Sequence, residues 1–143
     1  MKRSNYLMFG IFAMILTASV VTTFAQSTDR DNPMPLGSNG VSGSLNPNKL
    51  ENFYSFSAGP GELTITVDVQ ARHADIGVLN FELLARNAST PLLCCEFAQG
   101  DDGGTGRDVK TIKLTKRQTI ILHLTNGPVG GGTFSVRLSG ATH

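Results

Sequence analysis

Residues 52–70, NFYSFSAGPGELTITVDVQ, decide the fold of this 143-residue chain. In the second half of the stretch, every other residue from Leu63 to Val69 is apolar and the residues between are polar, which is the pattern of a strand with one buried face. The first half is aromatic and favours a strand, with Tyr54 and Phe56 on one face. Between the halves, the Gly-Pro-Gly of residues 59–61 combines the fixed φ of proline with the free φ of glycine. The stretch therefore predicts two strands of a β-sandwich joined as a hairpin.

The rest of the chain continues this pattern of short strands and turns. Strands are predicted at residues 40–45, 77–85, 92–97, 108–114, 118–125 and 132–138, with connections rich in Gly, Asn and Pro. The last two strands alternate cleanly and point Leu122 and Val136 inward. About eight short strands without a convincing helix indicate an all-β fold, an antiparallel β-sandwich or a jelly-roll-like arrangement. The strand at 132–138 is expected at a sheet edge.

The N-terminal 25 residues predict export. Lys2 and Arg3 precede an apolar run, and small residues lead to a cleavage point after Ala25, which is the pattern of a secretory signal peptide. The alternative is an uncleaved membrane anchor, because the run approaches the roughly 20 residues that span a bilayer. Threonines dilute the second half of the run and favour cleavage, which leaves no membrane span. The mature protein is expected to be secreted, periplasmic or in the cell envelope.

The remaining sequence predicts one domain. Residues 26–35 are polar and indicate a flexible lead-in, and residues 36–140 form the β-sandwich domain. Beyond the signal peptide, ten Lys and Arg face eleven Asp and Glu, and the basic residues are scattered, so we expect no nucleic-acid partner. No nucleophile elbow, phosphate loop or zinc-protease motif is present, and His123 is expected on the outward face of a strand. We predict that the protein is not an enzyme.

Cys94 and Cys95 are adjacent, which is unusual in a predicted strand. Neighbouring side chains of an extended strand point to opposite faces, so the two sulfur atoms would not meet there. Three interpretations stay open: one buried and one exposed thiol, a disulfide to another chain, or a vicinal disulfide in a strained turn. The first is preferred, because the flanking residues favour a strand and cysteine packs as a small apolar side chain.

The segment QGDDGGTGR, residues 99–107, is predicted to be a glycine-rich acidic loop. With Asp108 it places three carboxylates, those of Asp101, Asp102 and Asp108, within eight residues, and Ca²⁺ prefers several oxygen ligands on a mobile backbone. The spacing lacks the alternating ligands and closing Glu of an EF-hand loop, so a solvated turn is the simpler interpretation. Calcium at these three residues is the one cofactor that the sequence suggests.

The order of several segments resembles a known family. Gly43-Ser44-Leu45, then ENFYSF at 51–56, AGPGELTITV at 58–67, Ala74-Asp75-Ile76 and GTFSVRL at 132–138 are similar to the bacterial pre-peptidase C-terminal domain, which is related to the collagen-binding domains of clostridial collagenases. The resemblance covers about residues 36–140. It departs from the family in having no protease domain before the module and in having Glu51-Asn52 where an Asp is common.

The resemblance implies adhesion or targeting. We therefore expect an exported, non-catalytic module that binds an extracellular polymer, either a polysaccharide or a protein. The alternative is a structural component of the envelope or matrix that assembles through edge strands or through Cys94 and Cys95.

Overall fold

The structure, a computed structural model, describes residues 26–48, 51–128 and 130–143, so the predicted signal peptide lies outside the described residues. The described part contains strands and no helix, which confirms the all-β prediction. The strands are β1 (Met34–Pro35), β2 (Val41–Leu45), β3 (Glu51–Ala71), β4 (Ile76–Ala85), β5 (Pro91–Asp101), β6 (Thr105–Leu114), β7 (Gln118–Asn126) and β8 (Gly132–Thr142). Among these residues no helix is long and apolar enough to cross a membrane.

The eight strands form one hydrogen-bonded sheet that folds over itself into two layers. The pairing order is β2-β8-β3-β7-β4-β5, and β1 and β6 also pair with β3. The first half of β3 pairs with β7, whereas its second half pairs with β6 and β8. We call the layer of β5, β4, β7 and the first half of β3 the front sheet, and the layer of β6, the second half of β3, β8 and β2 the back sheet. All pairs are antiparallel except β1 with β3.

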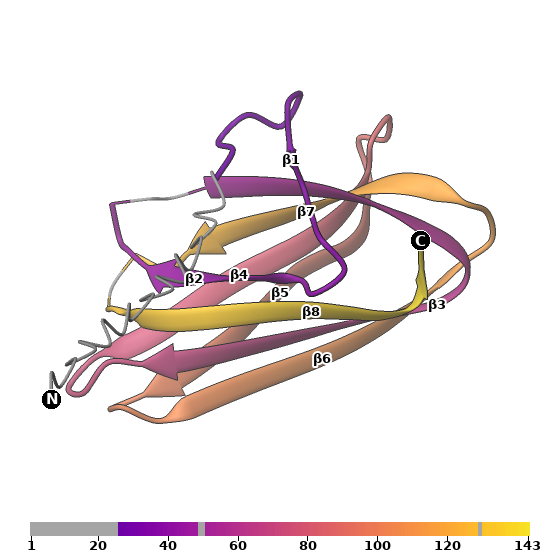
Figure 1. Cartoon of the computed structure of the whole chain (residues 1–143). Coiled ribbons are helices and arrows are strands. Elements are labelled where there is room, and N and C mark those ends of the chain that lie inside the picture. Colours follow the sequence, from indigo (N-terminus) through magenta and orange to yellow (C-terminus); the bar gives the residue numbers. More distant parts are fainter. Residues whose placement is uncertain (1–25, 49–50, 129) are drawn as a thin grey trace, which may run out of the picture.

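The predicted hairpin at 52–70 is wrong in one respect. Residues 51–71 do turn back on themselves, but the two halves of β3 do not pair with each other, and each belongs to a different layer (Figure 1). The bend lies at Gly59-Pro60-Gly61, where both glycines have positive φ and the Gly59–Pro60 peptide is cis. A wide arch replaces the hairpin because each half gains its own antiparallel partners and buries its apolar face against the opposite layer.

A second arch accompanies the first. β6 pairs with the second half of β3, and β7 pairs with the first half. Residues 115–117, which connect β6 to β7, therefore form a second arch between the two layers. The two arches touch at their corners, since a Cβ on Gly59 would lie 2.4 Å from the Lys116 carbonyl oxygen. Glycine is therefore needed at this position both for its positive φ and for the close approach of the neighbouring backbone.

The core lies between the two layers and follows the predicted alternation. The front sheet contributes residues such as Tyr54, Phe81 and Leu122, and the back sheet contributes residues such as Ile65 and Val136. The inward positions of the last two predicted strands are confirmed, because each forms part of this cluster or packs against it. The sheets are thus held by the apolar surface that the period-two pattern places on one face of each strand.

Two further details differ from the sequence predictions. β8 is not an edge strand, because it lies between β2 and β3, and the strands with one described partner are β1, β2, β5 and β6. The acidic loop is shorter than predicted, since β5 extends to Asp101 and β6 starts at Thr105. Both differences arise from long-range pairing. The ladders continue through residues whose local sequence favours a turn.

The segment before β2 runs along the open side of the first half of β3. The Phe53 amide donates to the Ser27 carbonyl at 2.8 Å, and the Leu36 amide donates to the Ser55 carbonyl at 2.7 Å. Arg30 Nη2 donates to the Ala88 carbonyl at 3.1 Å. These contacts cover an edge that would otherwise expose backbone hydrogen-bonding groups.

Candidate functional site

The outer face of the front sheet carries polar, charged and aromatic side chains. Opposite residues in an antiparallel ladder point to the same face, so the register places Asn80 beside Phe97 on one side and Thr125 on the other. Two residues along β4, Glu82 lies opposite His123. Asn80 and Glu82 point outward because their neighbours on β4, such as Phe81, belong to the core. We call the outward residues of these four strands the front face.

His123 is fixed from several directions. Its Nδ1 lies 2.6 Å from Glu82 Oε1, and its ring stacks on Phe53 with centroids 4.4 Å apart and planes 7° apart. Its Nε2 lies 3.9 Å from Glu51 Oε1. Only 16% of the His123 side chain is exposed. The expected position of His123 on an outward face is therefore correct, but neighbouring side chains cover most of the ring.

The structure joins Cys94 and Cys95 in a vicinal disulfide. Both cysteines are exposed, so the preferred interpretation of one buried and one exposed thiol is wrong. The reason is a bulge: between the pairs Phe81–Glu96 and Leu83–Leu93, β5 has one residue more than β4. At this bulge Cys95 has a φ of 65°, and the regular alternation of side chains is broken.

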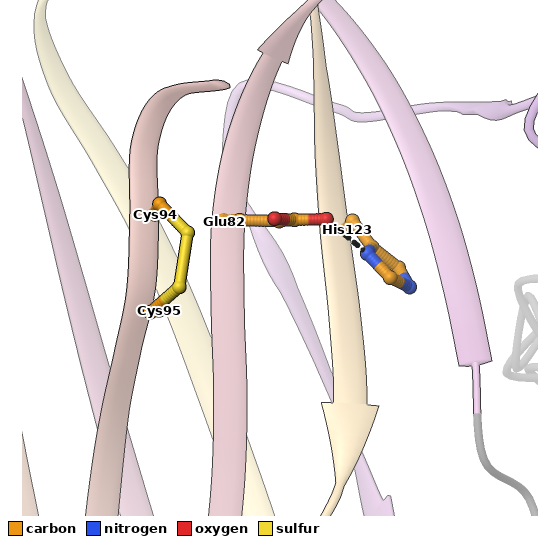
Figure 2. The surroundings of a disulfide bond; sticks show 4 residues. All are labelled: Glu82, Cys94, Cys95 and His123. Carbon is orange, nitrogen blue, oxygen red and sulfur yellow. Dashed lines mark hydrogen bonds and ion pairs between the residues drawn. A yellow bond between two sulfur atoms is a disulfide. The ribbon is translucent and has the colours of Figure 1, made fainter. Parts of the chain in front are cut away.

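The disulfide, Glu82 and His123 lie in a row across β5, β4 and β7 (Figure 2). Beside this row is a shallow depression of about 330 Å³, which is lined by Asn80, Phe81, Glu82, Cys95, His123 and Thr125. Phe97, next to Asn80 in the ladder, is 56% exposed. The depression therefore combines a carboxylate, an amide, a hydroxyl and one half of the disulfide, Cys95, with an exposed aromatic ring nearby.

The three aspartates of the predicted calcium site have separate partners. Asp102 Oδ1 accepts from the Ala74 amide at 2.9 Å and lies 3.1 Å from His73 Nδ1. Asp101 Oδ1 accepts from Gln99 Nε2 at 3.0 Å. Asp108 points to Lys110, 3.5 Å away, from a position well inside β6. No group of three or more His, Cys, Asp or Glu side chains suited to a metal occurs within the described ranges. Calcium binding at the loop stays a prediction.

The outer face of the back sheet has a different character. Asp68 lies between two arginines, with Arg107 Nε at 2.5 Å and Arg137 Nη2 at 2.7 Å. The Asp68 carboxylate raises the pKa of Arg107. A depression of about 480 Å³ beside Asp68 is lined mainly by hydroxyl and amide side chains, and the aromatic residue that lines it, Phe134, is buried. The charge of Asp68 is thus already balanced within the protein.

Of the residues that line the front-face depression, sequence reasoning singled out Cys95 and His123 but not Asn80, Glu82 or Thr125. The signal was present, because the alternation at 77–85 that sends Leu79 and Phe81 inward also sends Asn80 and Glu82 outward. What the sequence does not contain is the register that sets Glu82 beside His123 and the bulge that turns both cysteines to the surface.

No known protein family's model matches the chain, and no curated protein matches it. Several solved structures are similar in fold. The pre-peptidase C-terminal domain of a Bacillus anthracis collagenase is 15% identical over 76% of this chain and 95% of its own, with a TM-score of 0.48. A CBM36-1 domain of a multidomain xylanase from the hindgut metagenome of Trinervitermes trinervoides is 19% identical over 76% and 91%, with a TM-score of 0.42. A CBM4 structure is 11% identical over 65% and 61%, with a TM-score of 0.46.

The fold and the front face together define a β-sandwich domain with a polar depression on one sheet. A pre-peptidase C-terminal domain, the type that the sequence resembles, is among the structures with a similar fold. At these identities and TM-scores the likenesses carry no argument about function.

Proposed function

We propose that this protein is an exported, non-catalytic β-sandwich module that binds an extracellular polymer through its front face. Two observations support export. Residues 1–25 have the pattern of a signal peptide. The Cys94–Cys95 disulfide fits an oxidising compartment, since disulfides are rare in cytosolic proteins.

The observation that carries the binding proposal is the composition of the front face. Phe97 exposes 56% of its surface beside a depression that contains the Asn80 amide, the Glu82 carboxylate and the Thr125 hydroxyl. An exposed aromatic ring next to a few placed polar groups is the usual make-up of a recognition surface. The open, shallow form of the depression suits a chain that passes across the sheet.

The same residues favour binding over catalysis. Glu82 and His123 are paired with each other, and the Phe53 ring covers one face of the imidazole. The sulfur that lines the depression is bonded in a disulfide, so it is not a thiolate nucleophile. We assign the Glu82–His123 pair to positioning and to hydrogen bonding with the ligand.

The experiment is co-sedimentation of the protein with a panel of insoluble polysaccharides, peptidoglycan and collagen, with calcium and with chelator. Phe97→Ala is expected to weaken retention about tenfold, the loss of roughly 1.4 kcal/mol. Val109→Ala is the matched control, because Val109 is 50% exposed and lies opposite Thr66 in the back sheet. Absence of saturable retention on every polymer, or equal loss in the two variants, would contradict the proposal.

The alternative, a structural subunit, would use the strands β2, β5 and β6, each of which has one described partner. Assembly through disulfides between subunits loses support, because Cys94 and Cys95 bond to each other. Sizing chromatography over a wide concentration range separates the two functions. A binding module is expected to elute at one size, and an assembly subunit would grow with concentration.

A further inference from the structure

The vicinal disulfide on the front face has no obvious role in the stability of the fold. A disulfide stabilises mainly by restricting the unfolded chain, and this effect grows with the length of the loop that it closes. Cys94 and Cys95 are adjacent in sequence, so their bond restricts no other part of the chain. Both residues are also exposed, so the sulfur atoms add little to the core. A role for this bond is therefore expected at the surface of the protein, where a ligand can reach it.

The disulfide stands beside groups that can bind a ligand. Cys95 lines the depression together with Asn80, Glu82 and Thr125. Glu82 and the cysteine pair lie on neighbouring strands, β4 and β5, and Glu82 lies opposite the bulge that contains both cysteines (Figure 2). Among the described residues, Glu82 Oε1 contacts His123, and the other carboxylate oxygen can accept a hydrogen bond from a ligand.

The chemistry of this set selects a class of ligand. Sulfur atoms are apolar and polarisable, and the closed ring of a vicinal disulfide holds two of them in fixed positions on the surface. A carboxylate, an amide and a hydroxyl around it provide acceptors and donors in a small area. A sugar ring has the matching pattern, with apolar C–H groups on its face and hydroxyl donors on its rim. The carboxylates of Glu82 and Glu51 near His123 disfavour an anionic ligand.

We propose that the depression is a subsite for an uncharged carbohydrate, in which the Cys94–Cys95 disulfide forms the platform under a sugar ring and Glu82 accepts hydrogen bonds from its hydroxyls. This inference rests on the proposed function and names the ligand class of the same face. It also makes binding dependent on the oxidised state of the two cysteines.

Reduction breaks up the platform but keeps every atom of the two side chains and adds only one hydrogen to each sulfur. With a water-soluble phosphine as reductant, the S–S bond breaks, each sulfur atom takes a proton, and the phosphine is oxidised to its oxide with oxygen from water. The two thiols then rotate independently, so the ligand must order them again at a cost in conformational entropy.

The experiment measures the affinity of the full chain for neutral polysaccharides such as cellulose, xylan and a mixed-linkage glucan, by co-sedimentation or affinity electrophoresis. The oxidised protein is compared with phosphine-reduced protein whose melting temperature has been checked. The expected result is affinity for one of these polysaccharides that falls about tenfold on reduction and returns on reoxidation.

Variants test the two parts of the subsite separately. Cys94→Ala with Cys95→Ala is expected to bind like the reduced protein and to be insensitive to phosphine. Glu82→Ala keeps the disulfide and is expected to lose at least about tenfold, because hydrogen bonds to a charged group contribute about 1.5–3 kcal/mol. Thr66→Ala, a half-buried position on the back sheet, is the control and is expected to bind as the wild type does.

The outcomes separate this inference from the proposed function. If the protein binds a polysaccharide and its affinity is unchanged by reduction, by Cys94→Ala with Cys95→Ala and by Glu82→Ala, the subsite alone would be overturned. Retention on collagen or another protein, with none on polysaccharide, would also overturn it and leave the binding module standing. No retention on any polymer would overturn the proposed function and the subsite together. If the double cysteine variant does not fold, reduction of the wild type and Glu82→Ala decide.

Discussion

At the scale of single residues, burial changes the chemistry of a few side chains. Tyr54 is fully buried in the core cluster, and this burial raises the pKa of its hydroxyl, an effect that the Gln26 side chain partly offsets. His123 lies on the outer face of the sheet instead, where stacking on Phe53 and the contact with Glu82 hold its ring. Both positions follow from the alternation of inward and outward side chains on adjacent strands.

The first prediction concerns alkaline stability. An exposed tyrosine ionises near pH 10, whereas folded Tyr54 ionises at higher pH, so the unfolded state loses its proton first. The contribution of Tyr54 to stability is therefore complete below pH 10 and falls as the pH rises through its raised pKa, by up to about 1.4 kcal/mol per pH unit. Urea unfolding at several pH values should show a smaller alkaline loss in Tyr54→Phe than in the wild type.

The tyrosine content allows a direct check. The chain has two tyrosines, Tyr6 and Tyr54, and Tyr6 lies in the predicted signal peptide. In protein that starts at residue 26, phenolate absorbance reports Tyr54 alone. A titration midpoint at the value of a free tyrosine, with the protein still folded, would contradict the prediction.

At the scale of elements, the paired arches decide how the two layers meet. β3 crosses from the front sheet to the back sheet at Gly59-Pro60-Gly61, and the β6–β7 connection crosses beside it. Gly59 has a φ of 92° and its position leaves no room for a side chain next to the Lys116 carbonyl. The corner therefore requires glycine at residue 59, whereas the strands on either side of it accept several residue types.

The second prediction is that Gly59→Ala destabilises the protein by about 2 kcal/mol, because alanine would have to adopt a disfavoured φ and displace the neighbouring arch. Gly37→Ala is the matched control, since nothing lies within 4 Å of a Cβ there. Denaturant midpoints of the two variants and the wild type provide the measurement. Equal stability of the two variants would show that the corner tolerates a side chain.

At the scale of the whole molecule, one end of the sandwich brings three connections together. The Asp102 amide donates to the Asp75 carbonyl, the Gly103 amide donates to the Arg72 carbonyl, and the Arg72 amide donates to the Gly131 carbonyl. Gln70 Nε2 also bonds to the Gly103 carbonyl. The acidic turn is thus held by neighbouring loops, and its carboxylates take part in that network.

The third prediction tests calcium at this end. Calcium binding at Asp101, Asp102 and Asp108 requires a rise in melting temperature with added calcium, equivalent to about 2.7 kcal/mol at a hundredfold excess over the dissociation constant. Asp101→Asn combined with Asp102→Asn should abolish the rise, because it removes two of the three charges. Differential scanning calorimetry with calcium and with chelator provides the measurement.

Asp31→Asn is the control for this series, because Asp31 is exposed and lies outside the turn. No rise in the wild type, or an equal rise in the wild type and the double variant, would remove calcium from this loop.

The sequence by itself determined the all-β class, the approximate strands and the inward residues such as Leu63, Ile120 and Phe134. These depend on the period-two alternation of apolar side chains, which is local information. The tertiary structure alone decided that residues 51–71 form an arch, that β8 lies inside its sheet, and that Cys94 and Cys95 share a bulge beside Glu82. Each of these depends on which strands pair and in which register, and register is set by contacts between residues far apart in the chain.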